Sequence, residues 1–287
     1  MRARLTAARL PETETVYRAA PDPRRWQQGV PLAELVDVVN HWRTEYKWRS
    51  FEERLDRNGQ FRTTIDDLGI HFLHRRSARA DATPLVLTHG WPGSIAEFVD
   101  VVDELADPQD ADAPALATDG LTAVERKWTE ETRDFWRHRA AYAKQQATRP
   151  QTIGYSLVDS PVGLLAWILD EFAECSDTED SPFETISIDR VLDDVTLYWM
   201  TRTGASSARI YYESHNSLDP ELRVDVPSAV TMYPRDIEKC PRPWAQERYR
   251  QIVRWRSPES GGHFPSLEVP RYFVKDLQEG LAAVLSA

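Results

Sequence analysis

Cysteine is almost absent from this sequence, with two residues among 287. Cys175 and Cys240 lie in unrelated contexts, so they supply neither a CxxC pair nor a set of metal ligands. Proteins of oxidising compartments often contain several cysteines paired as disulfides, whereas this chain has only two cysteines. We therefore expect a reducing compartment and a cytoplasmic location.

Long apolar runs and blocks of positive charge are also missing. No run approaches the roughly 18 residues that a membrane span needs, and residues 1–20 lack the apolar centre of a signal peptide. The net charge is −11, which argues against a nucleic-acid partner and against an anionic membrane surface. The sequence has no clustered His or Cys ligands and no Gly-rich phosphate loop, so we expect no metal and no organic cofactor.

The first third of the chain carries the pattern of an α/β protein. A helix is predicted from Pro31 to Trp48, followed by strands at Phe61–Ile65 and Ile70–Arg75, with Gly69 expected to supply the positive φ of the turn. The apolar run Pro84–Thr88 then leads through a Gly/Pro turn into a helix with an apolar stripe from Ile95 to Leu105. A buried strand, a turn and a helix form the unit of a parallel sheet.

The rest of the chain is first helical and then mixed. Residues 107–120 lack periodicity and are interpreted as an exposed linker, whereas residues 121–200 show repeated helical spacing without a clear strand. Strand patterns return at Val226–Tyr233 and Gln251–Trp255, and a last helix is predicted from Phe264 to Leu285. A helical block between two parts of a sheet is typical of a lid.

Two polar residues near the C-terminus are candidates for acid–base chemistry. Gly261 and Gly262 free the backbone to hold His263 at a loop tip above the sheet, where an imidazole can act as general base. Asp236 follows the preceding strand, and an acid at this place orients such a His. The alternatives are a His that only caps a helix and an Asp that caps a helix or pairs with Arg235.

The turn after the first buried strand is a candidate oxyanion site. Gly90, Trp91 and Pro92 lie where the loop after an early strand supplies one backbone N–H, here that of Trp91, with the Trp91–Pro92 bond a candidate for the cis form. The alternative is a tight turn without catalytic meaning.

Several long segments resemble the microsomal-type epoxide hydrolases of the α/β-hydrolase superfamily. They are FRTTIDDLGIHFLH (61–74), LVLTHGWPGS (85–94), YAKQQATRPQTIGYSLVDSPVGLLAWI (142–168), TLYWMTRTGASSARIYYE (196–213) and RWRSPESGGHF (254–264). The resemblance implies an α/β-hydrolase core with an incomplete, mostly parallel sheet. Its parts would be an N-terminal meander with the first hairpin (1–76), the first part of the core with a shortened linker (77–120), a helical lid (121–222) and the C-terminal part of the core (223–287).

The resemblance also implies a reaction, the hydrolysis of a small apolar epoxide to a vicinal diol through an Asp ester. By their place in the motifs, Tyr142 and Tyr211 would protonate the opening oxygen, His263 would activate water, and Asp236 would support the His. Tyr212 is expected to point elsewhere. Without the resemblance, both tyrosines would be assigned to helix packing.

One part of the family pattern is missing, namely the nucleophile. The family carries it in a Gly-Gly-Asp-Trp-Gly type sequence on a strand–turn–helix unit, and neither this motif nor a G-x-S-x-G motif occurs here. A strand–helix–strand unit needs about 30 residues, more than residues 107–120 provide. Asp107, Asp110, Asp112 and Asp119 lack the setting that makes a carboxylate a nucleophile, so we assign none.

Three functions remain open on the sequence alone. The first is an epoxide hydrolase impaired by an internal deletion, and the second is a non-catalytic remnant that binds an apolar ligand. The third, an esterase or dehalogenase, is weakest because two lid tyrosines have no role in those reactions. Loss of central strands leaves unpaired edges, so we also predict low stability or self-association, for example as a homodimer.

Overall fold

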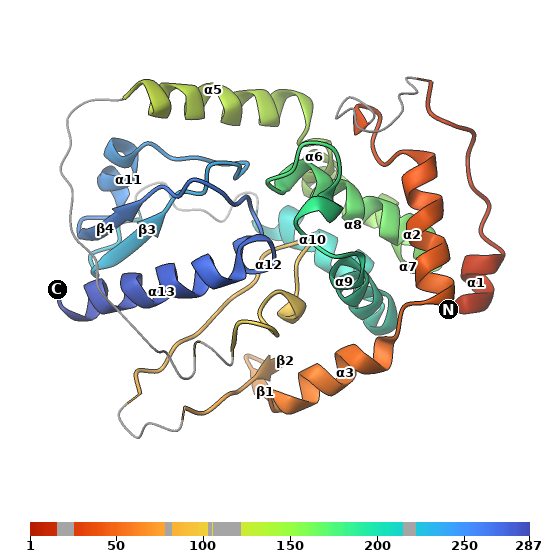
Figure 1. Cartoon of the computed structure of the whole chain (residues 1–287), viewed down its shortest axis with the longest axis horizontal. Coiled ribbons are helices and arrows are strands. Elements are labelled where there is room, and N and C mark those ends of the chain that lie inside the picture. Colours follow the sequence, from red (N-terminus) through yellow and green to blue (C-terminus); the bar gives the residue numbers. More distant parts are fainter. Residues whose placement is uncertain (16–25, 78–81, 103–104, 106–121, 215–221) are drawn as a thin grey trace.

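The computed structural model describes residues 1–15, 26–77, 82–102, 105, 122–214 and 222–287. Helices dominate these residues, and the strands form two separate two-stranded sheets. In Figure 1 the helices of residues 141–214 lie between the C-terminal sheet and the N-terminal helices. This helical block therefore joins the two ends of the chain.

The N-terminal region contains more helix than the sequence predicted. Its helices are α1 (Arg2–Thr6), α2 (Leu32–Thr44) and α3 (Trp48–Arg57). The prediction of a single helix ending near Trp48 was wrong, because α3 is a separate helix that buries only two side chains. Phe51 and Leu55 are 1% and 4% exposed and lie one turn apart. Two apolar positions among charged ones are too few to predict a helix from the sequence.

A tight hairpin follows α3. Strands β1 (Gln60–Ile65) and β2 (Leu68–Leu73) pair antiparallel, and the two loop residues Asp66 and Asp67 have φ values of 49° and 64°. This is the geometry of a type I′ turn, which requires positive φ at both loop residues. The prediction that Gly69 supplies the positive φ was wrong, since Gly69 lies inside β2.

Residues 84–88 do not form a strand. Val86 is 87% exposed and Leu85 is 39% exposed, and neither sheet of the described residues includes them. A strand is stable only when neighbours satisfy its backbone groups. The prediction of a buried strand was wrong because the described residues give this segment no partner.

The predicted helix after this segment is only partly described. Ser94 accepts a hydrogen bond from Ala96 N at 3.1 Å and caps the short 3₁₀ helix η2 (Ile95–Glu97). Val99 of the predicted stripe is 5% exposed, and Val101 beside the stripe is 1% exposed. Residues 98–101 form turns, so the prediction of a continuous helix from Ile95 was wrong for this part. The prediction for residues 103–104 and for the linker at 107–120 lies outside the described residues.

The predicted helical block is confirmed, with more breaks than expected. It consists of α5 (Ala123–His138), α6 (Ala141–Thr148), α7 (Pro150–Asp159), α8 (Pro161–Cys175), η3 (Pro182–Glu184), α9 (Ile188–Thr201) and α10 (Gly204–Ser214). The main core lies between α8, α9 and α2, where residues such as Leu165, Phe172 and Val195 are fully buried.

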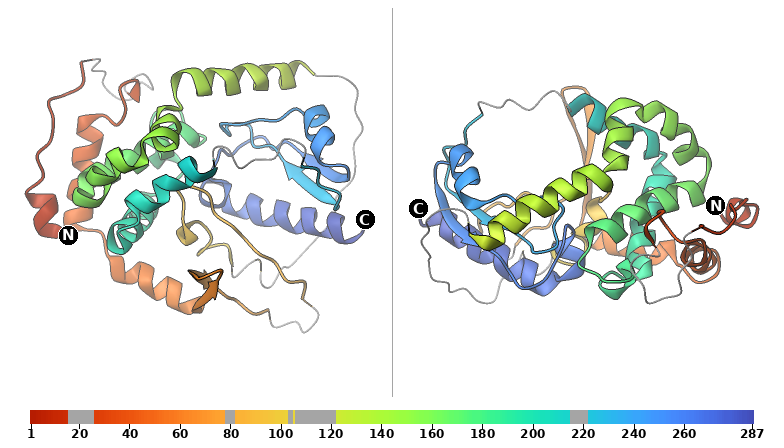
Figure 2. Two further views of the ribbon diagram at one scale, coloured as in Figure 1. Left: turned by 180° about the vertical axis from the view of Figure 1, so that it is seen from behind. Right: turned by 90° about the horizontal axis from the view of Figure 1, so that it is seen from above.

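The C-terminal region contains the parallel sheet. Strand β3 (Ser228–Thr231) pairs parallel with β4 (Ile252–Arg256), connected through α11 (Arg242–Arg248). The predicted final helix is divided into α12 (Pro265–Glu268) and α13 (Pro270–Leu285), because Pro270 cannot donate the hydrogen bond that would join them. Figure 2 shows α13 and α5 on different sides of this sheet.

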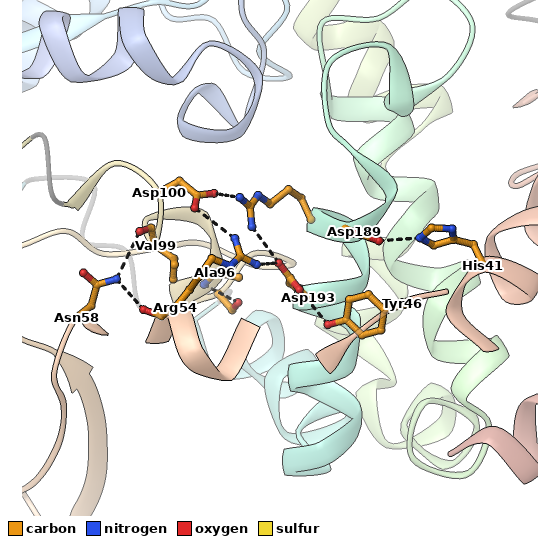
Figure 3. A network of polar contacts seen from close by, with 11 residues as sticks. His41, Tyr46, Arg54, Asn58, Ala96, Val99, Asp100, Asp189 and Asp193 are labelled. Atoms are coloured by element: carbon orange, nitrogen blue, oxygen red, sulfur yellow. Dashed lines mark hydrogen bonds and ion pairs between the residues drawn. The ribbon is translucent and has the colours of Figure 1, made fainter. Parts of the chain in front are cut away.

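A polar network around buried Asp193 fastens α9 to the N-terminal helices (Figure 3). Asp193 accepts hydrogen bonds from Tyr46 Oη at 2.9 Å and Arg190 Nη1 at 3.2 Å, and it forms an ion pair with Arg54. Asp100 pairs with both arginines. Because every charge in the network has an opposite partner, Asp193 can be ionised although it is only 2% exposed.

Candidate active site

The loop before α12 holds His263 through two glycines. Gly261 has φ 108°, and a Cβ at Gly262 would lie 2.6 Å from the Cys175 carbonyl oxygen. His263 N donates to that same carbonyl at 2.9 Å. Glycine is therefore needed at both positions to let the His loop approach the end of α8.

The structure brings His263 and Asp236 into contact. His263 Nδ1 lies 2.9 Å from Asp236 Oδ1, and Arg235 N donates to Gly261 O at 3.2 Å, which ties the two loops together. Burial by itself lowers the pKa of His263, but the hydrogen bond and the charge of Asp236 outweigh it, so the pKa is raised above its usual value of 6.5. The carboxylate thus favours the imidazolium.

Glu268 supports the same loop, and the sequence analysis did not identify it. Its carboxylate accepts hydrogen bonds from the backbone N–H groups of Asp177, Gly262 and Phe264 at 2.6, 3.0 and 2.8 Å. Gly262 and Phe264 flank His263 in the sequence, and Asp177 follows the end of α8. An acidic residue five positions after the candidate base was a weak signal, because acidic residues are common in the first turn of any helix.

Three aromatic side chains from three segments meet beside this loop. Trp91 stacks on Tyr142 of α6 with ring centroids 5.4 Å apart, and Tyr211 of α10 packs edge-on against both, at 5.7 Å from Trp91 and 5.9 Å from Tyr142. The two tyrosines singled out in the sequence are therefore neighbours, although 68 positions separate them. Tyr212 is 55% exposed and points elsewhere.

Both phenols of this cluster are protonated over the ordinary pH range. Burial raises the pKa of Tyr142 well above its usual value and that of Tyr211 to about 12, and a hydrogen bond between the two side chains further raises the former and lowers the latter. Phenols in this state can donate hydrogen bonds to an oxygen that gains negative charge.

A buried acid of α8 lies close to the phenols. Glu171 of α8 is 4% exposed and influences the pKa of both Tyr142 and Tyr211. Burial and two neighbouring acids raise the pKa of Glu171 to about 10. Glu171 is consequently neutral near pH 7 and is a poor nucleophile.

The turn at Gly90, Trp91 and Pro92 presents a free backbone donor. The Trp91–Pro92 bond is cis, as the sequence suggested. Within the residues that the structure describes, the Trp91 N–H has no hydrogen-bond acceptor. Tyr198 Oη donates to Gly93 O at 3.0 Å and anchors the turn on α9.

The turn, the phenols and the acid–base pair border one apolar cluster. Trp91, Tyr211 and Ile237 pack against buried Phe135, Ala140, Tyr142 and Ala143, and Ile237 directly follows Asp236. The Cys175 carbonyl that binds His263 N belongs to α8, beside Glu171. All the candidate residues thus surround the same region between α6, α8, α10 and the C-terminal loops.

A crevice of about 260 Å³ opens on the other side of Asp236. Asp236 and Ile237 line it together with charged side chains that include Arg139, Glu174 and Arg235, and no tyrosine lines it. An apolar substrate fits poorly in such surroundings. We therefore place the candidate site on the aromatic side.

The described residues include no group of three or more His, Cys, Asp or Glu side chains able to hold a metal ion. Among the same residues, no helix is both long enough and apolar enough to cross a bilayer. Cys175 and Cys240 are both free thiols. Asp107, Asp110, Asp112 and Asp119 fall in the stretch that is not described.

Comparison with known proteins gives a consistent result. Residues 1–98 match the family described as "Epoxide hydrolase N terminus". A protein of Stigmatella aurantiaca (strain DW4/3-1), whose name places it among the epoxide hydrolases, is 33% identical, with 97% of this chain and 81% of the relative covered. "Epoxide hydrolase 1" of Sus scrofa is 23% identical over 92% of this chain and 83% of its own length.

Solved structures show the same fold. The epoxide hydrolase of Aspergillus niger superimposes with a TM-score of 0.84 at 24% identity, covering 99% of this chain and 92% of the other. The juvenile hormone epoxide hydrolase of the silkworm Bombyx mori gives a TM-score of 0.78 at 24% identity, with 99% and 90% covered. The chain therefore has an α/β-hydrolase fold.

The alignment also reveals a difference in length. The match to the Stigmatella protein extends over 362 aligned positions, whereas this chain has 287 residues. At least 75 positions of the relative, the difference between those two numbers, consequently have no counterpart here. This agrees with the interpretation that the chain lacks a segment that its relatives contain.

Proposed function

Because this chain belongs to the epoxide hydrolase family, we propose that it acts on a small apolar epoxide bound between the Tyr142–Tyr211 pair and His263. In this proposal the helices of residues 121–222 form the lid that carries the two phenols. Residues 1–76 form the meander around the core, and residues 77–120 and 223–287 form the core. The observation that carries the proposal is the meeting of Trp91, Tyr142 and Tyr211 beside the His263–Asp236 pair.

The phenols supply the electrophilic half of the reaction. An epoxide oxygen gains negative charge as its C–O bond breaks, and Tyr142 and Tyr211 can stabilise and protonate it because burial keeps both phenols protonated. The Trp91 N–H is a further donor at this region. These groups act only as negative charge develops, which is when they accelerate the reaction.

The other half requires a nucleophile, and here the proposal departs from the family reaction. No described carboxylate has the setting of a nucleophilic aspartate, since Asp236 is bound to His263 and Glu171 is neutral. We propose direct hydration. Water loses a proton to His263 while its oxygen bonds to an epoxide carbon, the C–O bond breaks, and a phenol protonates the released oxygen to give a vicinal diol. The imidazolium then returns its proton to the phenolate through solvent, which restores both groups. Loss of the covalent step makes this reaction slow.

Turnover of styrene oxide by the full chain tests the proposal. We expect slow diol formation that falls by about 10²-fold or more in His263→Ala and by about 10-fold or more in Tyr211→Phe. Tyr212→Phe is the matched control, because the adjacent exposed phenol should not affect the rate. A wild-type rate equal to the uncatalysed rate, together with micromolar binding of the epoxide, would instead identify a non-catalytic binding protein.

Two finer features belong to the same proposal. The two free thiols fit a reducing environment, and we place the protein in the cytoplasm. We also propose that the chain self-associates, as a homodimer, because the apolar segment at 84–88 is exposed.

A further inference from the structure

Two buried carboxyl groups lie directly beneath the turn that carries the Trp91 N–H. Glu97 is 8% exposed and Asp194 of α9 is 3% exposed. The Glu97 carboxyl lies against Gly93 so closely that a Cβ at Gly93 would be 1.4 Å from Glu97 Oε1. Only glycine at position 93 therefore allows Glu97 to occupy this place.

Asp194 differs sharply from its neighbour Asp193. Within the described residues, Asp193 bonds to Tyr46, Arg54 and Arg190 (Figure 3), whereas neither carboxyl oxygen of the equally buried Asp194 lies within bonding geometry of a donor. A buried carboxylate without a counter-ion is strongly destabilising, and a neutral carboxylic acid is much less so.

The charged groups around Glu97 and Asp194 do not offset the cost of burying an ionised carboxylate. Asp193 is the charged residue whose field reaches Asp194, and it raises the pKa of that group. Its own partners, Arg54 and Arg190, are already shared with Asp100. Tyr198 is a neutral phenol anchored on Gly93 O. Burial, with Asp194 nearby, raises the pKa of Glu97 to about 8. Burial also raises the pKa of Asp194 to about 8, against a smaller lowering by the Ser94 hydroxyl.

We infer that Glu97 and Asp194 are positioning residues that hold the Trp91–Gly93 turn against α9 as neutral acids, so that ionisation of the pair loosens the turn. The role of the turn as an oxyanion donor rests on the proposed function, but the positioning itself does not. Glu97 acts through its contact with Gly93. Asp194 lies on α9, the helix whose Tyr198 donates a hydrogen bond to the Gly93 carbonyl oxygen of the turn.

The raised pKa values of Glu97 and Asp194 determine how the stability of the folded chain changes with pH. In the unfolded chain both carboxyls ionise near their usual values of 4.5 and 3.8, whereas in the folded chain they hold their protons to about pH 8. The folded state binds more protons between these limits, so its stability falls as the pH rises from about 4 to about 8. Asp170 and Glu171 add to the same trend, so only variants can isolate the pair.

Thermal melts of the full chain at pH 6 and pH 9 test the inference. We expect the melting temperature of the wild type to be lower at pH 9 by several degrees, about 4 °C or more. Asp194→Asn keeps the shape and removes the ionisation, so it should reduce this difference by about a quarter, because Glu97 and Glu171 keep their contributions. Near-ultraviolet circular dichroism from Trp91 and its tyrosine neighbours should weaken at pH 9 in the wild type and weaken less in the variant.

Asp193→Asn is the matched control on the same helix. It removes the paired charge, so it should lower the melting temperature at both pH values. Because Asp193 raises the pKa of Asp194, the pH difference should also narrow, but by less than in Asp194→Asn. The inference is overturned if Asp194→Asn keeps the full wild-type pH difference, or if the wild-type aromatic signal is unchanged between pH 6 and pH 9. Should Asp194→Asn not fold, Glu97→Gln provides the same comparison. Neither readout needs a substrate, so an absence of epoxide turnover would count against the proposed function alone.

Discussion

The chemistry of His263 depends on one neighbouring carboxylate. Burial lowers the pKa of His263, and Asp236 raises it through a hydrogen bond and through its charge, with Glu268 and Glu238 acting in the same direction. A general base must be neutral before it can accept a proton. His263 therefore becomes active only above its raised pKa, and Asp236 then stabilises the imidazolium that forms.

Replacing Asp236 by Asn should lower the pKa of His263 below its wild-type value, because the amide no longer stabilises the imidazolium. Titration of the imidazole ring protons by NMR measures this directly, with His263→Ala used to assign the signal. Glu238→Gln is the control, since Glu238 acts on His263 by charge alone and should produce a smaller shift. An unchanged titration in Asp236→Asn would contradict the assigned pairing.

At the scale of structural elements, loops and turns hold most of the candidate site, and a turn elsewhere in the chain holds strained backbone positions. The His263 loop is held by the Cys175 carbonyl and by the Glu268 carboxylate, so its position is set by α8 and α12 together.

The hairpin between β1 and β2 uses two aspartates at positive φ. Aspartate tolerates this conformation, but glycine adopts it without steric cost.

Asp67→Gly should accordingly stabilise the chain. Asp-Gly is a preferred sequence for a type I′ turn. We expect a gain of about 0.5 kcal/mol in the free energy of unfolding, because relief of the strained position, worth about 1 kcal/mol, is partly offset by the larger conformational entropy that glycine loses on folding. Chemical denaturation measures it. Gly69→Ala is a suitable control, because Gly69 lies in β2 with no atom near its Cβ position. A loss of stability in Asp67→Gly would exclude the I′ explanation.

At the scale of the whole molecule, apolar side chains of the described residues lie exposed where a larger sheet would cover them. Leu85 and Val86 are 39% and 87% exposed. The apolar segment at 84–88 and the small β3–β4 sheet are what remains of a larger parallel sheet in this interpretation, and exposed edges of this kind promote association.

We therefore expect the wild-type chain to self-associate and Val86→Lys to reduce this association. Val86 is 87% exposed, so a lysine costs little stability in the monomer and blocks strand pairing by its charge. Light scattering after size exclusion measures the mass over a range of concentrations. Val124→Lys is the matched control, since Val124 is also exposed, at 57%, but lies on helix α5. A wild-type chain that stays monomeric at all concentrations would exclude this model of association.

Local patterns in the sequence determined much of the outcome. Helical periodicity identified the block from 121 to 200, and the motifs around Tyr142, Tyr211, Asp236 and His263 identified the residues that meet at the site. These features depend on neighbours within a few positions or on short motifs, which a single sequence contains. Whether the four side chains carry out the proposed reaction stays a prediction.

Tertiary structure alone decided the features that depend on distant partners. Residues 84–88 have the composition of a buried strand, yet a strand needs neighbours that the described chain does not supply. Glu268, Glu97 and Asp194 look like ordinary surface acids in the sequence, and only the folded chain surrounds them with backbone donors or with apolar atoms. Burial and hydrogen bonding, which set the charge of such groups, arise when remote segments pack together.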